Sequence, residues 1–176
     1  MKRVSSQLIY CSPDQLLRSS VVEQDEDGNI TQLFDLQAQQ SETAQTLFFD
    51  GIISAEIISL KQYLSAKQIV ELGKKYNYID ISDNNLTEIL DFSDKPFVLD
   101  FGTNDITTIN NILKNRNRFF MHFNASQLIT ACSYLPIEIL DLPLNIQSGQ
   151  KPNLLLWQGF DISSKKVRSQ IRIIPL

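Results

Sequence analysis

The chain is organised around Leu47-Phe48-Phe49-Asp50-Gly51-Ile52-Ile53-Ser54-Ala55-Glu56-Ile57-Ile58-Ser59-Leu60-Lys61-Gln62-Tyr63-Leu64. Residues 47–53 form a short, nearly continuous apolar run, which is typical of a strand buried on both faces. Earlier stretches predict three further strands, at residues 2–10, 16–24 and 30–36. Between the last two, Asp27-Gly28 supplies the positive φ angle of a tight hairpin turn. The first third of the chain is therefore predicted to be a β-meander.

The composition is that of a globular protein, with 176 residues, 43% of them apolar and 20% charged. A net charge of -4 and an isoelectric point near 5.0 argue against a nucleic-acid partner, because no basic patch can replace the counterions. The sequence holds no apolar run of about 20 residues, so no membrane partner is expected. The first residues lack the apolar core of a signal peptide, and the two cysteines lie far apart. We therefore expect a cytoplasmic protein.

The central stretch resembles the signature of the amidohydrolase superfamily of metal-dependent hydrolases and deaminases. In that family the last strand of a small β-sandwich passes through a Gly-apolar-apolar-x-Pro-Gly turn into a barrel strand that ends in His-x-His. Gly51-Ile52-Ile53 matches the start of the turn, Ala55-Glu56 replaces Pro-Gly, and Ile57-Ile58 matches the barrel strand. Lys61 and Tyr63 occupy the two histidine positions. The resemblance therefore implies a relative whose ancestral metal ligands have been replaced.

The resemblance has a second part near the C-terminus. In the family the chain leaves the barrel through a glycine turn and a small-residue pair, and an apolar strand then rejoins the sandwich. Gly149 matches the turn glycine, Pro152-Asn153 the pair, and residues 154–157 the returning strand. A last strand is predicted at residues 170–175. Both signatures stand in the order that the family shows, one at each flank of the chain.

The segment between these flanks is too short for the family's barrel. A (β/α)8 barrel needs about 200 residues or more, whereas about 80 lie between Leu60 and Leu142. We therefore predict a mixed α+β fold without a full (β/α)8 barrel. Its small composite β-sandwich is formed by residues 1–60 and 142–176, and a compact α/β insert with a parallel sheet by residues 61–141.

The insert repeats itself with a period of about twenty residues. Ile79-x-Ile81-x-x-Asn84 recurs as Leu99-x-Phe101-x-x-Asn104 and, less completely, as Phe119-x-Met121-x-x-Asn124. Each copy pairs a short strand with an asparagine turn and an amphipathic helix, which predicts parallel strands with right-handed crossovers. The first two copies also resemble a leucine-rich repeat, so a short solenoid is an alternative to the compact layer. A helix over residues 66–76, with Val70 on its buried side, is predicted before the repeat.

Candidate site residues follow from this arrangement, because ligands bind beyond the carboxyl ends of parallel strands. The polar residues expected there are Asp80, Asp83, Asn84, Asp100, Thr103, Asn104, Asp105, His122 and Asn124. The run Phe101-Gly102-Thr103-Asn104-Asp105 resembles the Gly-Thr-Asp that carries the last metal ligand in many amidohydrolases. Asn104 would then stand in the place of that aspartate.

These residues have two interpretations. They form a carboxylate cluster around one divalent cation, with His122 as ligand or general base, or they cap helices. We favour capping, because Asp83, Asp105 and Asn124 each precede a predicted helix. A single histidine cannot supply the four that the family's metal site normally uses. Lys61, in turn, either neutralises carboxylates that once faced a metal or is a solvated residue at a helix start; we favour the second.

The sequence thus predicts a non-catalytic, amidohydrolase-like binding or assembly module, whose partner is a second copy of the chain or another protein. The alternative is a metal-dependent hydrolase that acts on C–N bonds with a site rebuilt at the strand ends of the insert. Under that alternative the catalytic candidates are His122, Asp100 and Asp105, and a divalent metal is the cofactor. Otherwise no cofactor or metal ligand is assigned. A third hypothesis is a peptide-binding surface on the face of the repeat.

Overall fold

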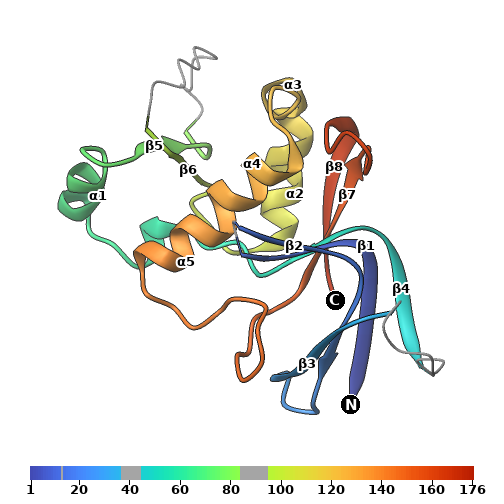
Figure 1. Ribbon diagram of the computed structural model, residues 1–176. Coiled ribbons are helices and arrows are strands. Elements are labelled where there is room, and N and C mark those ends of the chain that lie inside the picture. The colour runs from blue at the N-terminus through green and yellow to red at the C-terminus, as the bar shows by residue number, and fades with distance from the viewer. Residues whose placement is uncertain (13, 37–44, 84–94) are drawn as a thin grey trace.

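A six-stranded sheet forms the larger part of the protein (Figure 1). The computed structural model describes residues 1–12, 14–36, 45–83 and 95–176. The sheet has the order β3-β2-β1-β4-β7-β8, in which β1 and β4 are parallel and all other neighbours antiparallel. Its strands are β1 (Lys2–Ser12), β2 (Gln15–Gln24), β3 (Ile30–Asp35), β4 (Thr46–Ser54), β7 (Leu155–Phe160) and β8 (Val167–Pro175). The two flanks therefore pair with each other, as predicted, but in one six-stranded sheet rather than in the two packed sheets of a β-sandwich.

The insert contributes a second, two-stranded sheet and a layer of helices. Strands β5 (Asn77–Asp80) and β6 (Phe97–Asp100) are parallel and in register over four residue pairs. The helices are α1 (Ala66–Leu72), α2 (Ile106–Asn115), α3 (Asn117–Phe120), α4 (Ala125–Ile129) and α5 (Leu135–Ile139), with a 3-10 turn η1 (Leu60–Gln62) and a π-helical turn η2 (Thr130–Tyr134). The predicted mixed α+β class without a barrel is confirmed.

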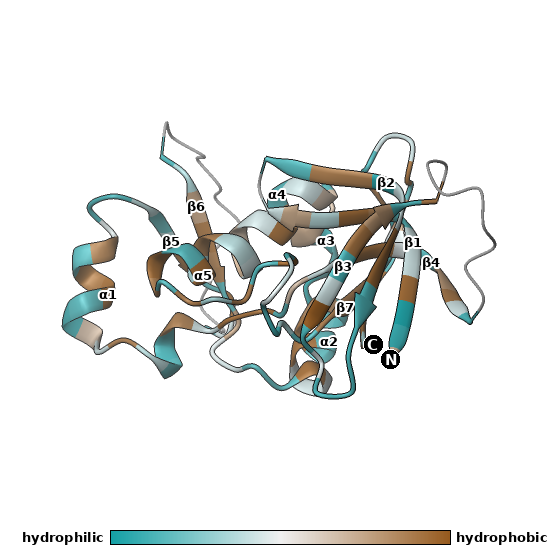
Figure 2. Cartoon of the chain, turned by 60° about the horizontal axis from the view of Figure 1, so that its bottom comes forward, coloured by the Kyte–Doolittle hydropathy of each residue, from teal (hydrophilic) through white to brown (hydrophobic). Residues whose placement is uncertain are grey.

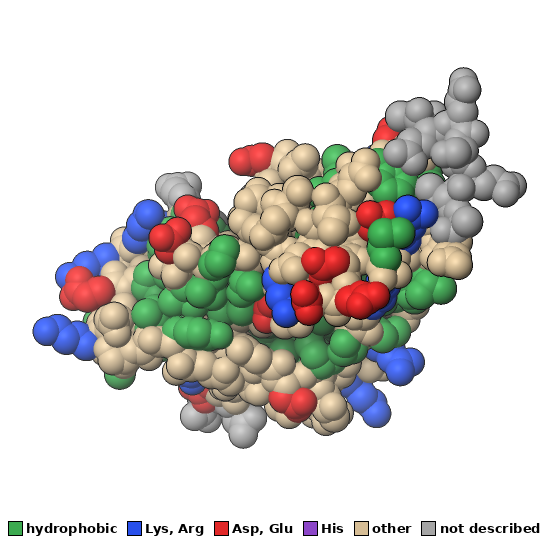
Figure 3. Space-filling view, turned by 90° about the horizontal axis from the view of Figure 1, so that it is seen from below, with side chains coloured by type: hydrophobic (Ala, Val, Ile, Leu, Met, Phe, Trp, Pro, Cys, Tyr) green, Lys and Arg blue, Asp and Glu red, His purple; other side chains and the backbone are tan. Residues whose placement is uncertain are grey.

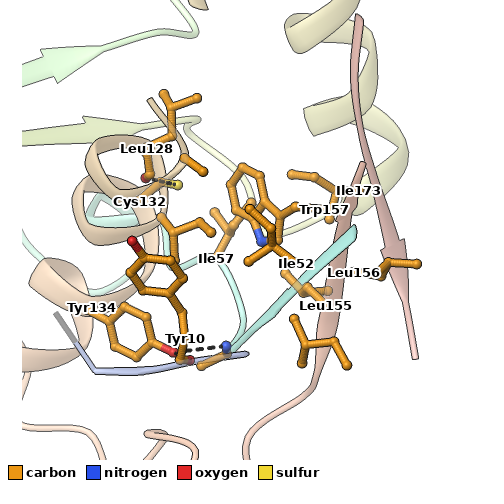
Figure 4. Close-up of a cluster of buried hydrophobic side chains, with 14 of the residues drawn as sticks. Tyr10, Ile52, Ile57, Leu128, Cys132, Tyr134, Leu155, Leu156, Trp157 and Ile173 are labelled. Carbon is orange, nitrogen blue, oxygen red and sulfur yellow. Dashed lines mark hydrogen bonds between the residues drawn. The ribbon is translucent and has the colours of Figure 1, made fainter. Parts of the chain in front are cut away.

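The core lies where the large sheet meets η2 and the helices around it. Hydrophobic residues run along much of the sheet's strands (Figure 2), and Trp157, Tyr10 and Tyr134 are among the largest fully buried side chains (Figure 4). The Tyr134 hydroxyl donates to the Tyr10 carbonyl, which joins η2 to β1. Both cysteines are buried and unpaired, and burial raises the pKa of the Cys11 thiol to about 11. The core is therefore shared between the flanks and the insert.

Strand β4 differs from the sequence-based prediction in two ways. It pairs in parallel with β1, so the four N-terminal strands are not a simple meander. It is also buried only in part, because Ile52 and Ile53 are fully buried whereas Leu47 and Phe48 are 54% and 65% exposed. Among the described residues, β7 pairs with β4 at residues 52–54 and not along its first half.

The predicted strand is present in two of the three copies of the repeat, and the turn and helix predicted for the first copy lie outside the described residues. The first two supply β5 and β6, but Phe119 belongs to α3 rather than to a strand. Helical geometry places the rings of Phe119 and Phe120 edge to face at 5.1 Å and lets Phe120 stack on Phe101 at 6.2 Å, which an extended chain would not do. The solenoid alternative therefore fails, since no described third strand continues the parallel sheet. Asn84 lies outside the described residues.

The helix predicted at residues 66–76 exists but is shorter and more exposed than expected. It ends at Leu72, and Val70 is 70% exposed rather than buried. The Ser65 hydroxyl accepts from the Gln68 N–H, and the Gln68 side chain accepts from the Ser65 N–H, which forms a capping box. Local capping explains why this short helix forms although it buries no residue completely.

Candidate functional site

The carboxyl ends of β5 and β6 bring two predicted candidates together. Asp80 and Asp100 are the last residues of the two strands and are paired across the small sheet. The turn η1 lies against this edge, because its Lys61 bonds to both aspartates. The predicted meeting of strand-end carboxylates is therefore confirmed for this pair.

Asp100 is fully buried and accepts four hydrogen bonds. Its Oδ1 accepts from the Ser59 hydroxyl at 2.7 Å and from the Gly102 N–H at 2.8 Å. Its Oδ2 accepts from the Tyr78 hydroxyl at 2.7 Å and from the Lys61 N–H at 3.0 Å. An ionised carboxylate offers about four lone-pair positions. The protein itself therefore saturates the Asp100 side chain.

The negative charge of Asp80 is stabilised by an ion pair as well as by hydrogen bonds. Its Oδ2 forms an ion pair with Lys61 Nζ, and its Oδ1 accepts from the Ser82 hydroxyl at 2.6 Å and the Ser82 N–H at 3.0 Å. Burial acts to raise the pKa of Asp80, but the hydrogen bonds from Lys61 and Ser82 outweigh it and hold the pKa below its usual value. Lys61 thus pairs with a strand-end carboxylate, and it is also exposed in η1, as the interpretation favoured from the sequence expects.

Tyr78 acts as a fixed donor. Burial, together with the hydrogen bond to Asp100 and the charges of Asp100 and Asp80, raises the pKa of its hydroxyl well above the usual range. The hydroxyl is therefore protonated at neutral pH, and its proton points to Asp100. A tyrosine held in this way stabilises a buried carboxylate and is a poor general base.

Asn104 joins the cluster through the backbone of the central stretch. Its side-chain oxygen accepts from the Ser59 N–H at 2.7 Å, while the Ser59 hydroxyl bonds to Asp100. Ser59 and Tyr78 were not among the candidates predicted from the sequence. The signal for Ser59 was its place between Ile58 and Leu60, because a polar residue inside a buried apolar run needs a hydrogen-bond partner. No sequence signal singles out Tyr78.

The other candidates lie apart from this cluster. Asp105 caps α2, accepting from the Thr108 N–H at 2.8 Å, and Asn124 caps α4, accepting from the Gln127 N–H at 2.9 Å. Hydrogen bonds from Thr108 hold the pKa of Asp105 below its usual value. Capping, predicted for both, is confirmed.

His122, the only histidine of the chain, is exposed in the turn after α3. Its backbone N–H donates to the Phe119 carbonyl. It was expected at a strand end beside the aspartates, but its segment is helical and turned instead. Tyr63, which the amidohydrolase resemblance aligns with a histidine, is 52% exposed. Asp83 is exposed at the end of a described segment, so its predicted capping role falls on undescribed residues.

A separate surface feature is an apolar groove between α1 and α5. It has a volume of about 590 Å³ and is lined by Leu64, Leu72 and Ile139, with Lys67, Glu71 and Lys75 among its polar residues. Hydrophobic side chains gather at this end of the molecule (Figure 3). Grooves of this kind are found at binding surfaces.

The described residues contain no group of three His, Cys, Asp or Glu side chains that could hold a metal ion together. In the same parts of the chain, no helix has the length and apolar character needed to cross a membrane. Comparisons with protein-family models, with curated proteins and with solved structures found no match.

Proposed function

We propose that this chain is a non-catalytic relative of the amidohydrolase superfamily that serves as a binding or assembly module. The observation that carries the proposal is the saturation of Asp100 by Ser59, Tyr78 and the N–H groups of Lys61 and Gly102. A catalytic carboxylate keeps a lone pair for a metal, a water molecule or a proton. At Asp100 donors from the protein itself occupy all four lone-pair positions, so this carboxylate serves to stabilise the fold.

The charge at Asp80 supports the same conclusion. An ammonium group has three donors and no acceptor, so Lys61 cannot ligate a metal. It places a positive charge beside Asp80, at a position where the family resemblance expects a metal-binding histidine. A divalent cation at this edge would have to displace Lys61 and break the bonds to Asp100. The residues present therefore do not fit the metal that the resemblance implies.

The position of Asn104 supports the family relationship itself. Asn104 stands where Gly-Thr-Asp would place the last metal ligand, and its side chain holds the N–H of Ser59, two residues before Lys61. Two substituted ligand positions thus lie close together, although they are far apart in the sequence. An ancestral metal site whose ligands were replaced would leave such an arrangement.

The binding role rests on exposed apolar surface. The groove between α1 and α5 and the exposed half of β4 are both accessible to a partner. Apolar side chains that lie together on the surface mark interaction sites, so the groove favours an interaction protein over a scaffold without partners.

Metal analysis and activity assays test the proposal. The native protein should contain no stoichiometric zinc, iron or manganese and should not turn over cyclic amides or aminated bases. Asp100→Ala should lower the melting temperature strongly, whereas His122→Ala, at an exposed position, should leave it unchanged. Stoichiometric metal together with turnover that both variants abolish would overturn the proposal in favour of a rebuilt hydrolase site.

A further inference from the structure

Strand β4 has an edge that no described strand covers. Residues 46–49 pair with β1 on one side, and β7 pairs with β4 at residues 52–54 on the other. Beyond that point β7 departs, and the Gln158 side chain reaches the Asp50 carbonyl at 3.3 Å. We call the side of residues 46–50 that faces away from β1 the free edge. Backbone N–H and C=O groups of alternate residues point to such an edge and can bind an incoming strand.

Each outer edge of the sheet is bonded to a neighbouring segment near one end of its outer strand. At β8, the Asn110 side chain of α2 donates to the Ile173 carbonyl at 2.7 Å and accepts from the Ile173 N–H at 2.8 Å. At β3, the Ile30 N–H donates to the Gln150 carbonyl at 2.8 Å, and the Ile30 carbonyl accepts from the Gly149 N–H at 2.8 Å. Side-chain and loop contacts of this kind hinder edge-to-edge pairing at the residues where they occur.

On the free edge the Asp50 carbonyl accepts from the Gln158 side chain, whereas residues 46–49 have no such contact with the described parts of the chain, and this edge is apolar on both faces. Leu47 and Phe48 point to opposite faces, because side chains alternate along a strand, and both are exposed. Residues 46–50 contain no lysine, arginine or proline, the residues that commonly block an edge. Figure 1 shows this half of β4 at the rim of the sheet, on the side away from α1.

We propose that the free edge pairs antiparallel with the same edge of a second copy of this chain. The inference rests on the proposed binding function and names its partner. A twofold interface uses the same surface of both copies, so the strand must be complementary to itself. Residues directly opposite each other in an antiparallel pair have their side chains on the same face of the sheet. A twofold axis between the two strands therefore places one residue opposite the same residue of the second copy.

The sequence of the strand selects the register. With Phe48 opposite Phe48 of the second copy, Leu47 faces Phe49 and Thr46 faces Asp50, so every apolar residue has an apolar partner. Centring on Phe49 would set Phe48 against Asp50, and centring on Leu47 would set Phe49 against Gln45. Pairing about Phe48 also keeps the two Asp50 carboxylates apart, whereas like charges placed opposite each other destabilise a sheet.

Sedimentation velocity over a concentration series from about 1 µM to about 1 mM tests the dimer, because a short strand interface is small and therefore weak. The wild-type chain should shift from monomer to dimer along the series. Phe48→Glu should remain monomeric, since the two carboxylates would face each other. Val70→Glu is the matched control: Val70 is similarly exposed but lies on α1, so this variant should dimerise like the wild type.

Cysteine cross-linking tests the register. Residues directly opposite each other have Cα atoms about 4.5–5.5 Å apart, within the range that a disulfide spans. Phe48→Cys should therefore oxidise to a covalent dimer. Leu47→Cys alone should not, because residue 47 faces residue 49, but Leu47→Cys combined with Phe49→Cys should cross-link. The native cysteines are buried and should contribute little background.

A monomer at every concentration would overturn the inference, as would a dimer that Phe48→Glu leaves intact or equal cross-linking of Phe48→Cys and Leu47→Cys. Circular dichroism of each variant checks that it is folded. We expect the variants at position 48 to fold, because Phe48 is exposed. The metal and activity assays decide the proposed function separately. If the chain is monomeric and shows neither metal nor turnover, the dimer is excluded but the proposed binding function is not.

Discussion

The indole N–H of Trp157 donates a hydrogen bond of 2.8 Å to the Ser54 hydroxyl, 103 residues away in the sequence. Both residues are buried, and the bond joins β7 to the end of β4. Next to it, the Glu56 carboxylate accepts from the N–H and the side-chain amide of Asn153, each at 3.1 Å. The two stretches that resemble the amidohydrolase flanks are therefore bonded directly to each other.

Replacing Ser54 by alanine should destabilise the fold. The buried Trp157 N–H would lose its acceptor, and an unsatisfied buried donor costs about 1–3 kcal/mol. Urea unfolding measures the difference. Ser169→Ala, at an exposed position on β8, is the control and should change the free energy of unfolding by less than about 0.5 kcal/mol. Equal effects of the two substitutions would show that the Trp157–Ser54 bond contributes nothing.

Gly51→Ala should be more damaging than Gly149→Ala. Both glycines have positive φ angles, 145° and 84°, so both substitutions carry the cost of left-handed backbone, roughly 1–2 kcal/mol. At Gly51 the added Cβ would also overlap the carbonyl oxygen of Trp157, whereas at Gly149 it meets no atom within 4 Å. Thermal unfolding of both variants provides the comparison, and a Gly149→Ala variant that is the less stable of the two would contradict it.

Loss of the Asp100 carboxylate should be among the largest single-residue effects in this protein. Asp100→Ala removes the acceptor of four donors, and with each buried unsatisfied group costing about 1–3 kcal/mol we expect at least about 3 kcal/mol. Asp105→Ala removes the cap of α2, where about 1 kcal/mol is typical. Denaturant titration separates the two expectations, and a small effect at Asp100 would make it a candidate for a catalytic group again.

The ion pair between Lys61 and Asp80 should make stability depend on acidity. The pKa of Asp80 in the folded protein lies below its usual 3.8, so the folded state favours the ionised form. Its stabilising contribution is present above about pH 4 and is lost as the pH falls through the folded pKa. Unfolding free energies measured from pH 6 to pH 2 should therefore fall less steeply for Asp80→Asn than for the wild type.

Lys61→Met provides the complementary variant. Without the ammonium group, one of the two partners that lower the pKa of Asp80 is lost, so this pKa should rise toward the unfolded value. The stability lost on acidification should then be smaller than in the wild type, because the loss grows with the gap between the unfolded and folded pKa. Identical acid profiles for the wild type, Asp80→Asn and Lys61→Met would mean that the ion pair has no energetic role.

Local chemistry was enough to predict several features. The strands of both flanks follow from their apolar patterning, and the hairpin turn follows from Asp27-Gly28, whose glycine has a φ of 87°. Asp105 and Asn124 cap their helices as their positions before amphipathic segments predicted. Each of these features depends on residues within a few positions of one another, so the sequence contains the relevant information directly.

Other features depended on contacts that no local pattern encodes. Phe119 and Phe120 lie in an apolar segment that suits a strand as well as a helix, and packing against Phe101 selects the helix. Phe48 is exposed in the half of β4 that does not pair with β7, and the composition of β4 does not indicate where that pairing ends. Burial of β4 on both faces was therefore a wrong prediction for its first half.

By itself the sequence determined the mixed α+β class, the closure of the two flanks into one sheet and the polar strand ends of the insert. The tertiary structure alone decided that Ser59, Lys61 and Tyr78 converge on Asp80 and Asp100 and that His122 does not. The physical reason is the separation along the chain between the residues that interact. Patterning and capping act between neighbours along the chain, whereas the saturation of a buried carboxylate depends on donors from segments that only the folded chain brings together.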